Sequence, residues 1–156
     1  MLSIITDADS AVLRKKAEPI KDPTAPEVRA LITEMVEAMR ESKGVGLAAP
    51  QVGKSIRLFV AEVNGATRVF INPVITERSE SSIVFEEGCL SLPGKYLPVE
   101  RAERVTVTYD DIQGESKTMR ADGFLAIVIQ HETDHLDGIL MTDRYEEQPN
   151  KSVYAL

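Results

Sequence analysis

The chain has 156 residues, 43% of them hydrophobic, which is enough for one domain with its own core over residues 1–156. Its formal net charge of −7 disfavours a nucleic-acid surface, and no apolar run approaches the roughly 18 residues that a membrane span needs. A lone cysteine, Cys89, rules out an internal disulfide and favours a reducing, cytoplasmic setting.

The N-terminal part of the chain predicts one amphipathic helix. The apolar residues of segment 1–7 predict a short strand before it. Thr24 and Glu27 match a capping box, and apolar residues then recur at helical spacing over residues 25–42. Gly44 follows at the place where a glycine commonly ends a helix.

The middle of the chain predicts a series of short, mostly antiparallel strands. They are expected over residues 56–63, 68–71, 73–76, 83–85, 104–109 and 116–120. Asn64–Gly65 favours a two-residue hairpin turn between the first two of them. Asp122 can cap a last helix over residues 123–137, which Gly138 ends, and a short polar tail follows from Tyr145. The order of helix, strands and helix predicts an α+β fold.

The last predicted helix carries both histidines of the chain, His131 and His135. At this spacing they are separated by about 6 Å of rise and roughly 40° of rotation, so both imidazoles leave one face and can bind one ion. Glu132 lies beside the first histidine, within reach of a metal-bound water. The apolar run over residues 124–129 predicts that the helix is buried and that the site lies inside the domain.

A catalytic metal centre needs about three protein ligands and one open position. Metalloproteases with a long motif place a third histidine about six residues after the second, where this chain has Met141. Others use a glutamate roughly twenty or more residues further on. Only 21 residues follow His135, and Glu146 and Glu147 come too early. Both protease patterns are therefore weak, which leaves Cys89. An isolated cysteine is usually a small buried apolar residue, but the glycine before it and the bend expected after it favour a ligand.

Segment 44–51 is rich in glycine and alanine and ends in Gln51. One interpretation is a plain loop after a helix. The other is a backbone edge that an extended peptide can approach and pair with, because the side chains offer no bulk. Gln51 then presents an uncharged amide donor that suits a developing oxyanion.

Three motifs of this chain together resemble the peptide deformylase family. They are residues 44–51, 87–91 and 130–138, and the likeness extends over nearly the whole chain. The resemblance implies a metallo-amidohydrolase that removes the formyl group from the N-terminal formylmethionine of nascent polypeptides at the ribosome and releases formate. It also implies a cytoplasmic monomer of bacterial type, with phage or organellar origin equally compatible, and no direct binding to nucleic acid or membrane.

The resemblance further implies a cofactor and a mechanism. One divalent metal, Fe²⁺ in the cell with Zn²⁺, Ni²⁺ or Co²⁺ able to substitute, is bound by Cys89, His131 and His135. Metal-bound hydroxide attacks the formyl carbon, and Glu132 acts first as base and then as acid. The side-chain amide of Gln51 and the backbone N–H of Leu90 hold the oxyanion together with the metal.

The family's substrate side is also implied residue by residue. It corresponds here to Val45, Gly46, Phe85, Glu87, Phe124, Ile127 and Val128. The apolar side chains among them, with Leu90, would form the pocket for methionine, although each could equally be plain core. Glu87 and Arg101 are expected to form a pair that supports the cysteine segment. Tyr96 stands where some relatives carry an arginine that reaches the substrate backbone.

Two other classes of function compete with this one. A histidine pair with a glutamate also occurs in metal-dependent endopeptidases, which cleave internal bonds of unblocked peptides. The same ligands could belong to a non-catalytic metal-binding or peptide-binding domain. Glu132→Gln distinguishes an enzyme from a binding module, because an enzyme should lose activity and keep its metal.

Overall fold

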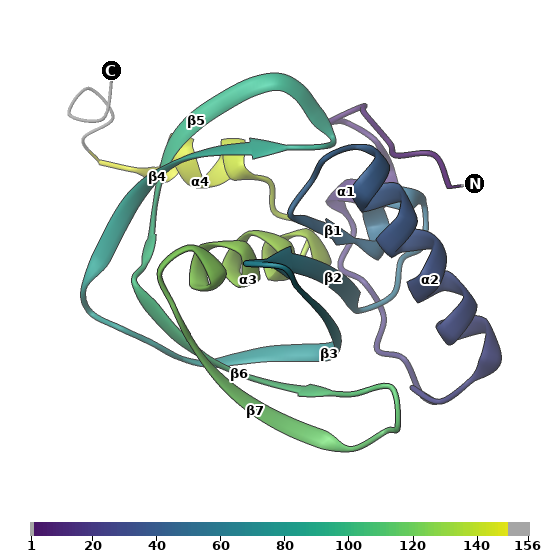
Figure 1. The fold of residues 1–156 in the computed structure, drawn as a ribbon. Helices are drawn as coiled ribbons and strands as arrows, with labels where there is room; N and C mark the ends of the chain where they lie inside the picture. The colour runs from purple at the N-terminus through teal and green to yellow at the C-terminus, as the bar shows by residue number, and fades with distance from the viewer. Residues whose placement is uncertain (1, 150–156) are drawn as a thin grey trace.

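The computed structural model describes residues 2–149, and its elements are arranged around one central helix. Helix α3 (Gly123–Leu136) runs through the middle, and the strands curve around it (Figure 1). All side chains from Ala126 to Leu136 are buried. The first half of α3 is apolar all round and therefore favours burial. The expected α+β fold with a buried C-terminal histidine helix is confirmed.

Five strands form one antiparallel sheet in the order β1-β2-β3-β6-β7. They are β1 (Gly46–Ala48), β2 (Leu58–Val63), β3 (Ala66–Arg78), β6 (Arg104–Asp110) and β7 (Ser116–Asp122). The predicted hairpin turn is confirmed, because Val63 pairs with Ala66 across it. Asn64 and Gly65 have φ values of 54° and 76°, and a type I′ turn requires positive φ at both positions.

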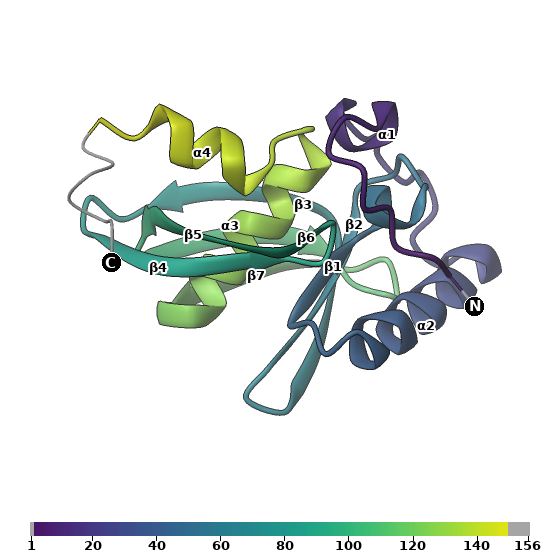
Figure 2. The same cartoon turned by 90° about the horizontal axis from the view of Figure 1, so that it is seen from above.

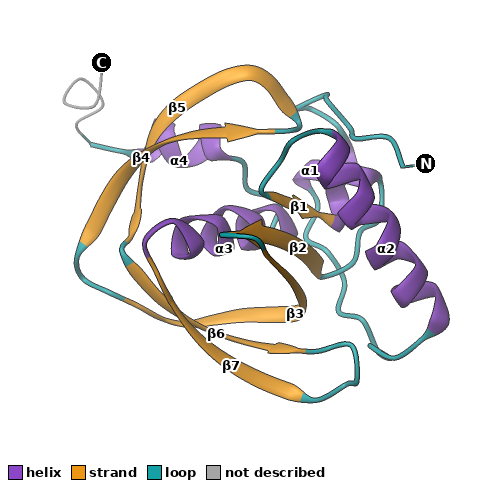
Figure 3. Cartoon of the chain, viewed as in Figure 1, coloured by secondary structure: helices purple, strands orange, loops and turns teal. Residues whose placement is uncertain are grey.

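A second, two-stranded antiparallel sheet consists of β4 (Ser82–Cys89) and β5 (Leu92–Ala102). Figure 3 shows that the strands of the two sheets surround most of α3. The strand expected over 83–85 is longer than predicted, and β5 was expected only at its start, as a bent strand over residues 90–94. Prolines within β5 weaken a strand signal, but a ribbon strand with one free edge tolerates them. The register shifts between Gly88 and Cys89, which changes where the cysteine points.

Strand β2 is buried on both faces because a helix covers each of them. Leu58 and Val60 pack in the apolar cluster that includes α2 (Pro26–Glu41), whereas Phe59 and Ala61 pack in the cluster that includes α3. Successive residues of a strand point to opposite faces, so one apolar run serves both clusters. This packing holds α3 against β1 and β2, the part of the sheet that borders the site.

The start of the chain differs from its prediction. Residues 2–7 form no strand, and Met1 lies outside the described residues. The backbone N–H of Ile5 instead donates to the backbone oxygen of Gln51 at 2.7 Å, so this segment is held by a single-turn 3-10 helix, η1 (Ala49–Val52), and not by a sheet. A short helix, α1 (Ala11–Arg14), follows and was not expected.

Helix α2 is confirmed, but its predicted capping box is wrong. The helix begins after Ala25, whose side chain cannot accept a hydrogen bond. The Thr24 hydroxyl donates to the carboxylate of Asp22 at 2.6 Å and so stabilises the preceding turn. Pro26 occupies the first helical position, where its fixed φ is favourable and its missing N–H costs nothing.

Strand β3 is one continuous element where two strands were predicted, over 68–71 and 73–76. The register with β6 shifts between Ile71 and Val74, and Asn72 has a φ of 51°. The residues that suggested a break therefore form a bulge, at which the strand changes direction without leaving the sheet.

An unexpected helix, α4 (Met141–Glu147), begins before the predicted polar tail and extends into it, and residues 150–156 lie outside the described residues. Figure 2 shows α4 beside the β4–β5 ribbon, far from α2. Gln148 fixes this contact, because its side-chain oxygen accepts from the Glu100 N–H at 2.7 Å and its amide donates to the Pro98 oxygen at 3.2 Å. Over residues 2–149, no helix combines the length and the apolar character needed to cross a membrane.

Candidate metal centre

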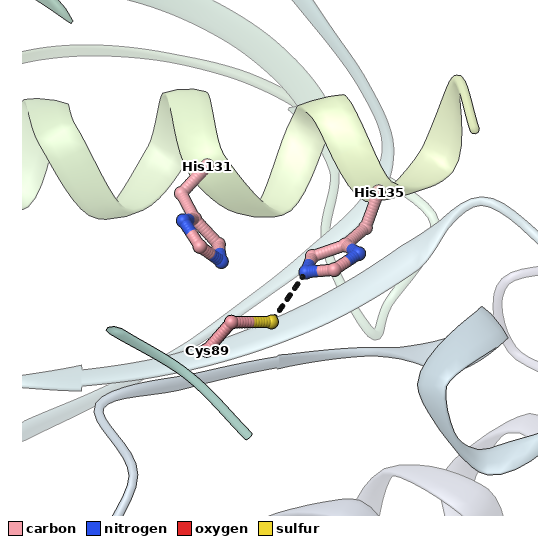
Figure 4. A group of neighbouring side chains, drawn as sticks. All are labelled: Cys89, His131 and His135. Atoms are coloured by element: carbon pink, nitrogen blue, oxygen red, sulfur yellow. Dashed lines mark hydrogen bonds between the residues drawn. The ribbon is translucent and has the colours of Figure 1, made fainter. Parts of the chain in front are cut away.

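Three side chains from two elements point toward one another (Figure 4). His131 and His135 come from adjacent turns of α3, and Cys89 comes from the last residue of β4. Their ligand atoms all lie within 4.8 Å of one another. The Cys89 Sγ atom is 3.4 Å from Nε2 of His135. The structure therefore brings together all three residues that the sequence suggested as ligands.

The first histidine is oriented by a buried carboxylate. Nδ1 of His131 lies 2.8 Å from Oε1 of Glu87, which leaves Nε2 as the nitrogen that can bind a metal. Histidine ligands commonly donate their second N–H to a carboxylate in this way, which fixes the ring and its tautomer. Glu87 is held in turn by a two-point contact, because Nε and Nη2 of Arg101 donate to its oxygens at 2.8 and 2.9 Å. The predicted Glu87–Arg101 pair is present.

The charges of the site suit a cation. Burial by itself lowers the pKa of His131, but its contacts with Cys89 and Glu87 and the nearby charge of Glu132 outweigh burial and raise that pKa well above its ordinary value. Burial lowers the pKa of His135, and the positive charge of His131 lowers it further. The two imidazoles together thus favour one positive charge, held at His131, over two.

The residues fit a divalent metal on two further grounds. A thiolate and two imidazoles are the donor set of Zn²⁺ and of other borderline first-row metals, and three protein ligands leave a fourth position open. Oε1 of Glu132 is also buried, with no hydrogen-bond partner among the described residues. A buried acceptor of this kind calls for a donor that the protein does not supply, such as a water at the open position.

Glu132 lies next to the ligands without joining them. Its Oε2 atom is 4.0 Å from Nε2 of His131. Burial raises the pKa of Glu132 to about 7; the charge of Glu87 adds to that rise, whereas the charge of His131 opposes it. A carboxyl group with such a pKa can accept and return a proton near neutrality.

Gly46 of β1 lies against this carboxylate. A Cβ atom at this position would lie 2.6 Å from Oε2 of Glu132, so a larger residue would force the carboxylate or the strand to shift. β1 is an end strand of its sheet, and no other strand of residues 2–149 pairs with its outer edge. The backbone oxygen of Val45 already accepts from the Glu62 N–H at 2.8 Å. Because bonding alternates along a strand, the backbone groups of Gly46 face the unpaired edge.

The amide of Gln51 is fixed with its donor toward the site. Its Oε1 atom accepts from the Ala48 N–H at 2.9 Å, which directs Nε2 away from β1. Nε2 lies 3.1 Å from Oγ of Ser91 and 3.7 Å from Sγ of Cys89. The fully buried Ser91 was not singled out from the sequence, although it belongs to the motif over residues 87–91.

A cavity of about 500 Å³ opens onto this group. All seven residues expected on the substrate side line it, together with Gln51, Cys89, Leu90, His131 and Glu132. Phe85 and Phe124 are in contact at its wall, with ring centroids 5.2 Å apart, and both remain partly exposed. They are therefore not core residues, whereas Ile127 and Val128 are buried and Val128 also belongs to the core cluster with α3.

Besides Ser91, the sequence did not single out Asp134 and Arg144, which are bonded to each other near the site. Asp134 lies within the histidine motif, but its partners come from β5 and α4. No local pattern gives those partners, because Arg101 lies 33 residues from Asp134 and Arg144, ten residues away, lies on a different helix. Tyr96 lies at the mouth of the cavity and is largely exposed.

Comparisons with known proteins agree with this geometry. The model of the polypeptide deformylase family matches residues 1–151. A peptide deformylase of Treponema pallidum is 51% identical over 132 residues, covering 85% of this chain and 81% of the relative. One of Dictyoglomus thermophilum is 43% identical over 152 residues, covering 97% of this chain and 98% of the relative.

Solved structures of peptide deformylases also resemble this chain. The crystal structure of peptide deformylase from Thermotoga maritima superposes with a TM-score of 0.89 at 42% identity, covering 92% of this chain and 97% of that one. The Acinetobacter baumannii class I type b enzyme, in a structure with Met-Ala-Ser bound, gives a TM-score of 0.87 at 35% identity, covering 92% of this chain and 98% of that one. The chain belongs to the polypeptide deformylase family.

Proposed function

We propose that this protein is a metal-dependent peptide deformylase, which hydrolyses the formyl group from the N-terminal formylmethionine of nascent polypeptides and releases formate. The observation that carries the proposal is the convergence of Cys89, His131 and His135 within 4.8 Å, at a cavity that Glu132 and Gln51 also line. Family membership and the Met-Ala-Ser peptide named for the Acinetobacter baumannii structure support the substrate class.

The metal in this proposal is held by Cys89, His131 and His135, and we propose Fe²⁺ as the ion used in the cell. A divalent metal supplies Lewis-acid chemistry at this position, because it polarises a carbonyl oxygen and acidifies a water. Zn²⁺, Ni²⁺ or Co²⁺ would fit the same donor set.

Glu132 and Gln51 then carry the chemistry that the chain supplies. Glu132, with its pKa raised to about 7, takes a proton from the attacking water and returns it to the departing amine. Nε2 of Gln51 donates to the developing oxyanion, and the backbone N–H of Leu90 adds a second donor. The bond from Ala48 to Oε1 of Gln51 supports this role, because it holds the amide in place before substrate arrives.

The substrate side follows from the cavity walls. The methionine side chain packs between Phe85, Leu90, Phe124, Ile127 and Val128. The peptide backbone pairs with the unpaired edge beside Val45 and Gly46, as an added strand. Glu87 lies on the cavity wall, but its oxygens bond to Arg101 and His131, so we assign it to ligand support. We further propose that the protein acts as a cytoplasmic monomer on chains emerging from the ribosome.

Formate release from formyl-Met-Ala-Ser tests the proposal. Protein loaded anaerobically with Fe²⁺, or with Ni²⁺, should release formate stoichiometrically with free Met-Ala-Ser. Glu132→Gln should retain the metal and lose activity by orders of magnitude. Metal-loaded protein without formate release would contradict the proposal. Cleavage of internal bonds in an unblocked peptide would instead indicate an endopeptidase.

A further inference from the structure

The metal centre is joined to helix α4 by a continuous line of charged hydrogen bonds. At one end, Glu87 accepts from Nδ1 of His131, and Arg101 donates twice to Glu87. Arg101 has a third bond, because its Nη1 atom donates to Oδ2 of Asp134 at 2.6 Å. Arg144 of α4 completes the line: its Nε and Nη2 atoms donate to the two oxygens of Asp134 at 3.0 and 2.8 Å.

The line runs from the surface to the interior of the protein. The Arg144 side chain is 36% exposed, whereas the side chains of Asp134, Arg101 and Glu87 are 7%, 4% and 3% exposed. Two guanidinium groups face two carboxylates, so the charges balance along it. Buried charges need such compensation, and removing one partner leaves the others poorly satisfied.

We infer that Arg144 is a positioning residue for the metal centre, acting on His131 through Asp134, Arg101 and Glu87. The inference rests on the metal site of the proposed function. Arg101 is shared between two carboxylates, and Arg144 satisfies one of them. Without Arg144, Asp134 depends on Arg101 alone and draws its guanidinium away from Glu87. The carboxylate that orients His131 is then held less firmly.

The expected loss is moderate, because Arg144 is removed from the metal by several bonds. Removing a direct hydrogen-bond partner of a metal ligand typically weakens metal binding by about 10- to 100-fold. For Arg144→Gln, which is further from the ligand, we expect a smaller effect, about a 3- to 10-fold weaker affinity. The ligand field should change as well, since the position of the His131 ring changes.

Arg14 of α1 provides a matched control, because it also binds α4. It pairs with Asp143 of α4 at 2.6 Å, and its side chain is 38% exposed, close to the exposure of Arg144. Asp143 has no bond to Asp134 among the described contacts, so Arg14→Gln weakens the docking of α4 without touching the line. A general effect of loosening α4 would therefore appear in both variants. An effect that acts through Asp134 would appear in Arg144→Gln alone.

The experiment uses Co²⁺ added to the metal-free full-length protein. Affinity is measured by competition with a chelator, and the visible and near-ultraviolet bands report the geometry of the cysteine and histidine ligands. Arg144→Gln should bind Co²⁺ about 3- to 10-fold more weakly with shifted bands, and Arg14→Gln should match the unmodified protein. Arg144→Lys, which keeps the charge and loses the two-point contact, should recover part of the affinity.

Several results would overturn the inference. An Arg144→Gln protein with unchanged affinity and spectrum would show that the line does not reach the metal. An equal loss in Arg14→Gln would assign the effect to docking of α4, and no recovery in Arg144→Lys would exclude the charge-based account. Failure of the unmodified protein to bind Co²⁺ would overturn the metal site of the proposed function itself.

Discussion

Replacing Gly46 by alanine should place a methyl group where the Glu132 carboxylate now lies. The added Cβ would be 2.6 Å from Oε2 of Glu132, and ordinary contact begins at 3.4 Å. The difference means that the carboxylate or the strand has to move by about 0.8 Å. A displacement of about 1 Å in a catalytic group can cost roughly 100-fold in rate, and we expect a loss of that order in kcat.

The assay is steady-state formate release from formyl-Met-Ala-Ser by nickel-loaded protein, with kcat and KM determined separately. Metal content should stay at one ion, because neither Gly46 nor Glu132 is a proposed ligand. Gly44→Ala is the control in the same segment. Its Cβ would lie 2.7 Å from Cδ1 of Leu90, the end of a flexible side chain that can rotate away, so its loss in kcat should stay below about tenfold.

An unchanged kcat in Gly46→Ala would refute the reasoning, since it would mean that Glu132 is not required at its present position. A rise in KM alone would show that the strand edge serves the substrate and that the carboxylate has relaxed at little cost. Equal losses in the two alanine variants would assign the effect to the segment as a whole.

Three further predictions concern the donor, the metal and pH. Gln51→Ala should lower kcat about 100- to 1,000-fold in the formate assay at unchanged metal content, because it removes an oxyanion donor; a loss below tenfold would argue against that role. Chelation should lower Tm by roughly 10 °C in calorimetry, since a metal at about 1,000 times its Kd contributes roughly 4 kcal/mol, and Cys89→Ala should abolish most of that difference. Burial alone raises the pKa values of Glu87 and Asp134, but their arginine partners lower both below the ordinary 4.5 and 3.8. The folded protein thus binds fewer protons at these two carboxylates than the unfolded chain does. The stability that the two carboxylates contribute is therefore present above their ordinary pKa values, and it is lost as pH falls below those values. The urea midpoint of metal-free protein should fall between about pH 5 and pH 3, and a flat profile would contradict the assignment.

Local patterns predicted the regular elements well wherever one period dominated. The amphipathic helix α2 and the hairpin at Asn64–Gly65 were found because each depends on residues close in sequence. Most of strand β5 was missed because its prolines weaken the strand pattern, and α4 was missed because its surface is mostly polar. The Thr24 capping box failed because the helix begins one residue later, after Ala25, and Thr24 belongs to the preceding turn, where its hydroxyl donates to Asp22.

In the candidate site, too, some features follow from local sequence and others depend on tertiary packing. The sequence by itself determined that His131 and His135 share one helix face, since α-helical geometry fixes that spacing. It also supplied Cys89 as a candidate third ligand. Only the tertiary structure decided that Cys89 reaches the histidines, through a register shift at the end of β4. It alone decided, too, that Arg144 reaches Asp134, because partners so placed depend on how whole elements pack against α3 and not on any local period.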